Sequence, residues 1–255
     1  GEGRVIDATP EPFSISEKTE RPATGIDNPS VTWTSEAHNR LAVLYWHITN
    51  KTLVLSVIDV ESNNMTTIHV ASHLSPQFDN PGAWARVVTT APNTLVLTFM
   101  DLEQRGLWAT SCVVGLEPDH PTVACLSPRL VDSGLATPDF TDYGFGAFPD
   151  LELHPISGLP HLVYFDQSLQ DPSLDAHAMG PGELKLLTCV DLECLHSRVE
   201  TLAKGKPGFG RDCSLTFSSN GQQMLVTFLD LQGLDDKNKM LARLAVFDNG
   251  NHTVL

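Results

Sequence analysis

The sequence predicts an all-β fold, a β-propeller of about four four-stranded blades, and three observations support this prediction. One phrase recurs: a turn residue, a run of apolar or β-branched residues, an aromatic residue and a final polar residue. Its copies are NRLAVLYWH (39–47), NTLVLTFMD (93–101), GLPHLVYFD (158–166) and GQQMLVTFLD (221–230). The copies end 54 to 65 residues apart, which leaves room for several short strands in each unit. No segment combines helical periodicity with capping residues, so we expect very little helix.

Length and charge limit the classes of protein that this chain can represent. With 255 residues and 41% hydrophobic content, it is long enough for a single closed domain spanning 1–255. Lys and Arg number 16 against 31 Asp and Glu, giving a formal charge of −15. Phosphate binding needs a concentrated positive surface, so nucleic acid is not an expected partner. The longest apolar runs have the length of strands, and no membrane span is expected.

Four repeats follow one another at about 26–73, 78–134, 140–205 and 206–255. The first contains four strand-like segments, SVTWTS, LAVLYWH, TLVLSVIDV and TTIHVAS, separated by turns rich in Asn, Ser and Lys. The second opens with FDNPG, which echoes IDNPS at the start of the first, and the third and fourth repeat the same order of strands. Asp, Asn, Pro and Gly together mark a turn because they bond to nearby backbone, fix φ or accept positive φ.

The N-terminal strand is expected to close the propeller. Its residues RVID (4–7) resemble RLVD (129–132) and RVET (198–201), which end the second and third repeats. Residues 1–9 would therefore complete the last blade and remove the open edge of a linear array. The alternative is that this chain is part of a larger propeller, with further blades supplied from elsewhere in an extracellular assembly.

Five cysteines indicate the compartment. Cys112 and Cys125 enclose a loop in the second repeat, and Cys189 and Cys194 enclose a shorter one at the matching place in the third. Two pairs at equivalent positions predict two local disulfides, with Cys213 left as a buried thiol. The alternatives are five reduced cysteines in a cytosolic protein, or metal binding. Zinc is disfavoured because the CxxxxC spacing is loose and lacks a neighbouring Cys or His pair.

Three glycosylation sequons agree with an extracellular location. They begin at Asn50, Asn64 and Asn251, and each falls where a strand pattern breaks into a turn. About two such triplets would arise by chance in a chain of this composition, so their placement is better evidence than their number.

The third and fourth repeats resemble extracellular β-propeller repeat proteins, in which units of the type GxGxxxSL, VxYYD and LKLxxCxDxxC recur. The resemblance implies the propeller architecture, while repeats of this kind serve lectins, enzymes and scaffolds alike. It covers residues 144–230 best and is weaker in the first repeat, which lacks cysteines. The residues that carry it are Gly144, Gly146, Leu162, Tyr164, Asp166, Leu184, Cys189, Asp191, Cys194, Gly208, Gly210, Ser214 and Leu215.

Three carboxylates end the second strand of their repeats, at Asp101, Asp166 and Asp230, with His47 in the corresponding place of the first. On one face of a propeller they could coordinate calcium or bind sugar hydroxyls. The alternative, which we prefer, is that each Asp bonds within its own blade, because a structural role recurs in every blade and a site does not.

Residues that break the repeat are better candidates for a binding site. Alignment on the glycines at 82, 146 and 210 places Arg86, Asp150 and Ser214 in register on the innermost strand, near the central channel. Their different character would suit a specific polar pocket. Alternatively, Arg86 and Asp150 simply pair across a wet channel. The longest insertion, 168–182, is a candidate binding loop that carries Asp175 and His177.

Catalytic patterns are weak. Asp27 with Asp150 or Glu152 could supply the acid and base of a propeller glycosidase. However, the Asp27 phrase DNP recurs at Asp79, where it reads as turn chemistry, and GxSxG, HExxH and phosphate-binding Gly loops are absent. The preferred hypothesis is therefore a secreted, non-catalytic module that binds a protein or glycan partner, with no required cofactor. The alternative is a glycan-processing hydrolase on a propeller scaffold.

Overall fold

The computed structural model describes residues 26–35, 39–101, 106–115, 117, 121–133, 147–167, 182–205, 209–232, 239–248 and 251–254. These residues form strands β1 to β17, and none of them is helical. The all-β prediction is therefore confirmed. The N-terminal strand that we expect to close the last blade lies outside the described residues.

The strands form four antiparallel sheets in chain order. The first sheet holds β1 (Ile26–Ser35), β2 (Arg40–His47), β3 (Thr52–Asp59) and β4 (Met65–Ser72). The second holds β5 (Pro81–Ala91), β6 (Thr94–Asp101), β7 (Gly106–Val114), β8 (Val123–Cys125) and β9 (Arg129–Asp132). The third holds β10 (Ala147–Leu153), β11 (Pro160–Gln167), β12 (Gly182–Cys189) and β13 (Ser197–Lys204). The fourth holds β14 (Phe209–Phe217), β15 (Gln223–Gln232), β16 (Lys239–Asp248) and β17 (Asn251–Val254).

The outermost strand of the second sheet is divided. We expected one strand through TVACLSPRLVD, but β8 and β9 are separate, and both pair with β7. The sequence between them, LSP, contains a proline, which cannot donate a hydrogen bond to a ladder. β9 is thereby free to lie against the third sheet, where it contacts β13.

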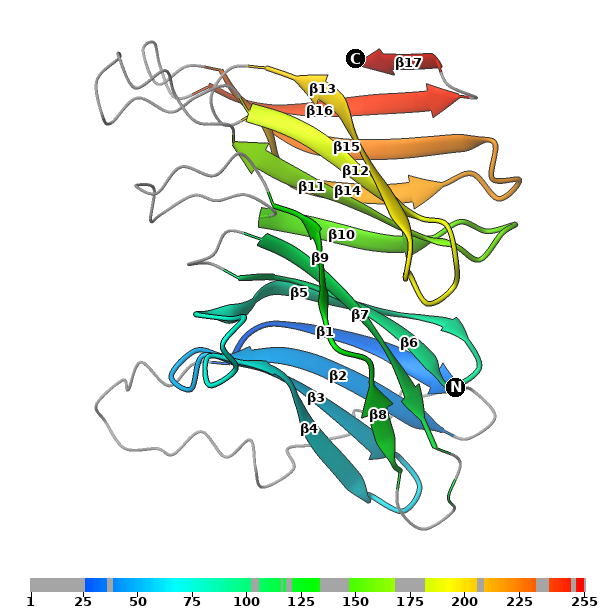
Figure 1. Ribbon diagram of the computed structural model, residues 1–255. Helices are drawn as coiled ribbons and strands as arrows, with labels where there is room; N and C mark the ends of the chain where they lie inside the picture. The colour runs from blue at the N-terminus through cyan, green and yellow to red at the C-terminus, as the bar shows by residue number, and fades with distance from the viewer. Residues whose placement is uncertain are drawn as a thin grey trace.

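The sheets are arranged as the blades of a propeller. The first strand of each sheet contacts the first strand of the next, so that β1, β5, β10 and β14 lie side by side along the inside of the array (Figure 1). In Figure 1 the first and fourth sheets lie at opposite ends of the stack.

The hydrophobic core consists of three layers between consecutive sheets. The first layer joins Leu44 and Leu55 to Leu97 and Phe99, all with no exposed surface. Because the two middle sheets have a neighbour on each face, their second strands are buried on both, as β6 shows along its length. In the end sheets β15 alternates instead, with exposed Thr227 between buried residues. The prediction that the second strand is buried on both faces thus holds along the middle sheets and fails for β15, while in the first sheet β2 is only partly buried on both faces and β3 is largely so.

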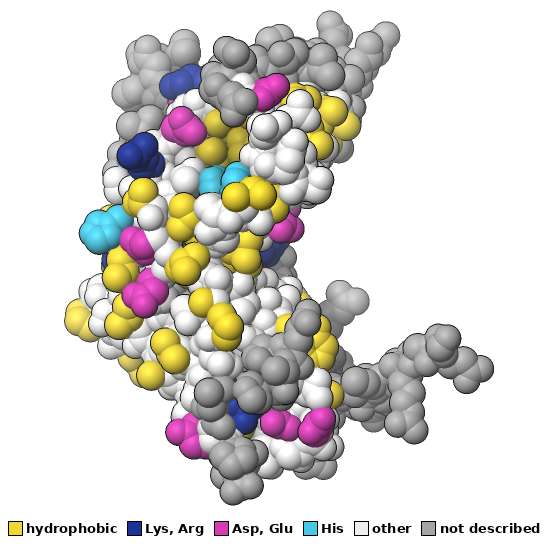
Figure 2. Space-filling view, turned by 90° about the vertical axis from the view of Figure 1, so that its right-hand side faces the viewer, with side chains coloured by type: hydrophobic (Ala, Val, Ile, Leu, Met, Phe, Trp, Pro, Cys, Tyr) yellow, Lys and Arg dark blue, Asp and Glu magenta, His cyan; other side chains and the backbone are white. Residues whose placement is uncertain are grey.

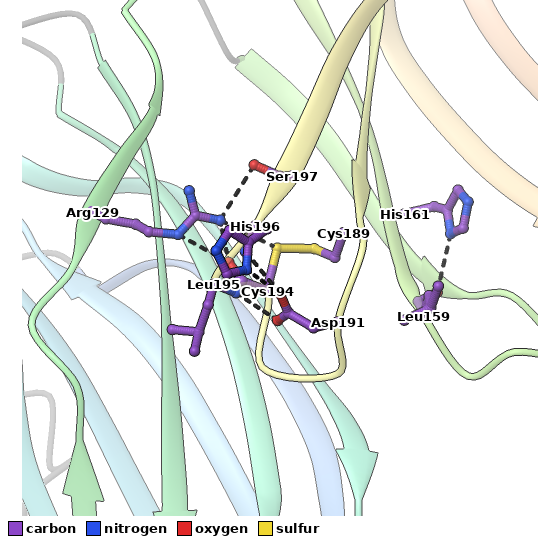
Figure 3. Close-up of a disulfide and its surroundings, with 9 residues drawn as sticks. All are labelled: Arg129, Leu159, His161, Cys189, Asp191, Cys194, Leu195, His196 and Ser197. Carbon is purple, nitrogen blue, oxygen red and sulfur yellow. Dashed lines mark hydrogen bonds and ion pairs between the residues drawn. A yellow bond between two sulfur atoms is a disulfide. The ribbon is translucent and has the colours of Figure 1, made fainter.

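Both predicted disulfides are present, Cys112–Cys125 and Cys189–Cys194, and Cys213 is a buried thiol on β14. The second bridge also marks a contact between blades (Figure 3). Arg129 of β9 donates from Nε to the carbonyl of Cys194 at 3.0 Å and from Nη2 to Ser197 Oγ at 3.3 Å. The disulfide loop of the third sheet is thereby held against the outer strand of the second.

Candidate functional site

Each innermost strand has an irregularity in its pairing immediately before the same position of the repeat. The register shifts fall at 27/30, 83/86, 147/150 and 211/214. The residue after each shift then pairs with the residue three before the end of the repeated phrase. These equivalent residues are Ser30, Arg86, Asp150 and Ser214. A bulge re-aims a side chain, and these four residues occupy equivalent positions directly after the bulges of the innermost strands.

Hydrogen bonds at this position join one sheet to the next. Ser30 Oγ accepts from the N–H of Val87 at 3.1 Å, which links β1 to β5. Asp150 Oδ2 accepts from the N–H of Leu215 and from Ser214 Oγ, both at 2.8 Å, which links β10 to β14. The structure therefore brings Asp150 and Ser214 into direct contact, which sequence reasoning had not paired.

Arg86 occupies the same position between the second and third sheets but cannot accept a hydrogen bond. Its guanidinium donates from Nη1 to the carbonyl of Ala85 at 2.9 Å. Burial lowers the pKa of Arg86, while the nearby Asp150 and Cys213 act in the opposite direction. Within the described chain no carboxylate lies within 4.0 Å of this guanidinium, so Arg86 and Asp150 are neighbours without a direct ion pair.

Glu152 lies two residues after Asp150 on β10, so both side chains project from the same face of the strand. Glu152 is an exposed residue, and its pKa is raised first by the desolvation it undergoes on the strand and then by the negative charge of Asp150. A carboxyl group that holds its proton to higher pH, beside a second carboxyl group, is the arrangement that acid catalysis of glycoside cleavage uses.

Several predicted residues fall outside what the structure describes. Asp27 lies on β1 opposite Trp46, but its side chain is not described. Asp175, His177 and the rest of the insertion up to residue 181 are outside the described residues. Their roles stay predictions. The sequons at Asn50, Asn64 and Asn251 likewise remain candidate glycosylation sites.

The three repeated aspartates are each bound within their own sheet. Asp101 accepts from the N–H groups of Asp79 (2.9 Å) and Asn80 (3.2 Å) in the turn before β5. Asp166 pairs with Lys185, and Asp230 pairs with Arg243 at 3.0 Å. Among the described residues, no group of three or more His, Cys, Asp or Glu side chains could hold a metal ion. Calcium binding stays an untested prediction.

A buried polar cluster between the second and third sheets was missed by sequence reasoning. Asp132, at the end of β9, accepts from the hydroxyl of Tyr164 at 2.7 Å and pairs with Lys185 Nζ at 3.2 Å. Lys185 also pairs with Asp166, which is 1% exposed. The signal available was the RLVD phrase itself, whose final Asp we read only as the end of a blade.

These features define the class of the protein, an all-β propeller whose innermost strands carry different polar residues at one equivalent position. No protein-family model and no curated protein sequence matches the chain. Among solved structures, it is similar to a mutant levansucrase from Bacillus subtilis, with a TM-score of 0.57 and 9% identity over 90% of this chain and 70% of that one. It is also similar to a sialidase from Trypanosoma rangeli in complex with sialic acid, with a TM-score of 0.52 and 8% identity over 92% of this chain and 38% of that one.

These similarities establish the propeller fold and correct one prediction. We preferred a non-catalytic binding or assembly module, and that preference is wrong. The similar propellers are a levansucrase and a sialidase, which favours the alternative of a glycan-processing hydrolase. At 8 to 9% identity the likeness extends to the fold alone, so any activity of this chain is a proposal.

The two disulfides agree with a protein outside the cell. Two disulfides are typical of oxidising compartments. Within the described chain, no helix has the length and apolar character needed to cross a membrane. On the face shown in Figure 2, basic side chains are sparse and dispersed among hydrophobic, acidic and uncharged ones. This face offers no concentrated positive area to a nucleic acid.

Proposed function

We propose that this protein is a secreted glycan-processing hydrolase in which Glu152 is the general acid and Asp150 its partner carboxylate. The observation that carries the proposal is the position of Asp150 and Glu152, two residues apart on one face of an innermost strand of the propeller, and the raised pKa of Glu152 agrees with it. Residues i and i+2 of a strand have Cα atoms about 6.5 Å apart. Carboxyl groups on such positions fall within the separation of about 5 to 9.5 Å that glycosidases use.

The two carboxyl groups would take different roles. Glu152 would donate its proton to the glycosidic oxygen as the bond to the anomeric carbon breaks. Asp150 is fixed in orientation by Ser214 Oγ and the N–H of Leu215. It would either attack the anomeric carbon or take a proton from the attacking water, and the stereochemistry of the product distinguishes these routes.

The test is hydrolysis of a panel of oligosaccharides and 4-nitrophenyl glycosides. Glu152→Gln should lower the rate by roughly 10²- to 10⁴-fold on oligosaccharides. Nitrophenol leaves without needing a proton, so the loss should be smaller on the nitrophenyl glycosides. Because the acid form of Glu152 is required, activity should fall as pH rises through its raised pKa, and the variant should lack that limb.

Glu200→Gln is the matched control, since Glu200 is an exposed carboxylate on β13. It should leave the rate unchanged. The absence of product from every glycoside, or full activity of Glu152→Gln, would overturn the proposed function.

A further inference from the structure

The junction between the second and third sheets departs from the pattern of the junctions on either side. At the first junction a serine oxygen accepts from the N–H of Val87, and at the third a carboxylate oxygen accepts from the N–H of Leu215. At the second junction the residue in the accepting position is Arg86, which has donors only.

The N–H that corresponds to those of Val87 and Leu215 belongs to Leu151. All three follow the bulged position and pair with equivalent residues of the second strand. In an antiparallel pair, alternate residues direct their N–H away from the partner strand. Since Val87 and Leu215 donate to the preceding sheet, the N–H of Leu151 is directed toward β5, where within the described chain no side chain accepts from it.

Arg86 adds charge and spare donors to the same junction. It is half-buried, and one of its five N–H groups is used on the carbonyl of Ala85. No carboxylate of the described chain lies within ion-pair distance, since Asp150 is turned to β14. Strands β5 and β10 are in contact, so a partly buried guanidinium on β5 and an outward-directed N–H on β10 can act together as donors to a planar oxyanion.

We propose that this junction binds the carboxylate of an acidic sugar, held by Arg86 and the N–H of Leu151. The third junction shows the same chemistry within the chain, because there the carboxylate of Asp150 accepts from the N–H of Leu215. This proposal rests on the proposed function and deepens it by naming the substrate class, a glycan that contains uronic or other carboxylate-bearing sugars. Leu151 lies between Asp150 and Glu152, so the anchored sugar would lie beside the acid pair.

The test compares two ligands that differ by one carboxylate, methyl β-D-glucuronide and methyl β-D-glucoside. Binding is titrated by NMR to the Glu152→Gln protein, in which hydrolysis does not interfere. The glucuronide should bind about 10- to 100-fold more tightly, the range expected for charge-assisted hydrogen bonds. Arg86→Ser in this background should reduce the preference to about twofold or less, while Arg86→Lys should retain part of it. Equal binding of the two ligands, no binding of the glucuronide, or a preference that survives Arg86→Ser would overturn the proposal.

A second measurement tests the direction of the Leu151 N–H in the absence of ligand. Serine at position 86 would recreate the acceptor that Ser30 supplies at the first junction, whereas alanine would not. Arg86→Ser should therefore melt about 2–4 °C above Arg86→Ala. Equal melting temperatures would mean that the N–H does not face this position, and the carboxylate site would fall. The two proposals can also fail separately. If no glycoside is hydrolysed but the protein still prefers the glucuronide, and this preference depends on Arg86, the proposed function is contradicted and the binding site is supported.

Discussion

The hydroxyl of Tyr164 donates a 2.7 Å hydrogen bond to Asp132 Oδ2, which joins β11 of the third sheet to β9 of the second. Lys185 completes this junction by pairing with both Asp132 and Asp166. Burial lowers the pKa of Lys185, but the two carboxylates outweigh it and raise the value overall. Burial raises the pKa of Asp166, an effect that Lys185 only partly offsets. The ammonium group is thus what permits two carboxylates at a nearly dry interface between blades.

Lys185→Met should lower the free energy of unfolding by about 3–5 kcal/mol near neutral pH, because it leaves buried negative charge without a cation. The folded-state pKa of Asp166 is already raised above its unfolded value, and loss of Lys185 raises it further. The penalty should therefore shrink as pH falls through that raised pKa and Asp166 becomes protonated. Urea unfolding at several pH values measures this.

Lys204→Met is the control for this prediction. Lys204 pairs with Glu183 at 2.6 Å, but its side chain is 65% exposed, so the loss should be at most about 1 kcal/mol. A Lys185→Met loss as small as that of Lys204→Met, or one that does not change with pH, would contradict the role given to the cluster.

Ser30→Ala should destabilise the protein by about 1–2 kcal/mol. The N–H of Val87, which is 6% exposed, would lose its acceptor on the preceding sheet. Ser219→Ala, at an exposed turn position, should change stability by less than about 0.5 kcal/mol. Denaturant unfolding of the two variants measures the difference. Equal effects would show that the bond between β1 and β5 contributes nothing to the junction.

The sequence was sufficient to predict the elements that repeat. The phrase ending at Asp101, Asp166 and Asp230 fixed the second strand of each sheet, and matching spacings fixed both disulfides. The register of Arg86, Asp150 and Ser214 followed from glycines that carry positive φ, such as Gly82 (φ 118°) and Gly210 (φ 97°).

Contacts between blades were not predictable, because they join residues that no pattern relates, such as Asp132 and Tyr164. The raised pKa of Glu152 was not predictable either, because it depends on the desolvation of the side chain in the folded protein.

Cysteine reactivity should follow the pairing in the structure. A peptide map without reduction should show Cys112 joined to Cys125 and Cys189 joined to Cys194. Burial raises the pKa of Cys213, so the native protein should react with iodoacetamide only slowly, and quickly once unfolded. A bridge between different sheets, or fast labelling of native Cys213, would contradict the structure.

Removing the two bridges should have unequal effects. The Cys112–Cys125 loop is longer, with a sequence separation of 13 against 5 for Cys189–Cys194. Loop-closure entropy then predicts a loss of about 3 kcal/mol for the first and about 2 kcal/mol for the second on replacement by serine pairs. Thermal unfolding of the two double variants measures this order, and the reverse order would show that contacts such as that of Arg129 with Cys194 outweigh loop entropy.

Gly210→Ala adds only one methyl group, but it should lower the stability of the protein strongly. Gly210 has φ of +97°, a conformation that L residues rarely adopt, and an added Cβ would lie 3.2 Å from the backbone nitrogen of Leu184. Because that neighbour is backbone of a fully buried strand residue, it cannot move aside as a flexible side chain would. Strain and crowding together should cost at least about 2 kcal/mol. The shift should also displace Ser214, four residues on, from Asp150.

Gly158→Ala separates the two contributions. Gly158 also has positive φ, +69°, but a Cβ there would meet only Leu192 Cδ2 at 3.6 Å, an ordinary contact. Gly158→Ala should therefore lower the free energy of unfolding by about 1 kcal/mol, the cost of placing a non-glycine residue at positive φ. Denaturant unfolding of both variants measures the difference, and Gly210→Ala should additionally lower glycoside hydrolysis, while Gly158→Ala should not. Equal losses of stability would mean that β14 does not pack against β12 as closely as the structure has it.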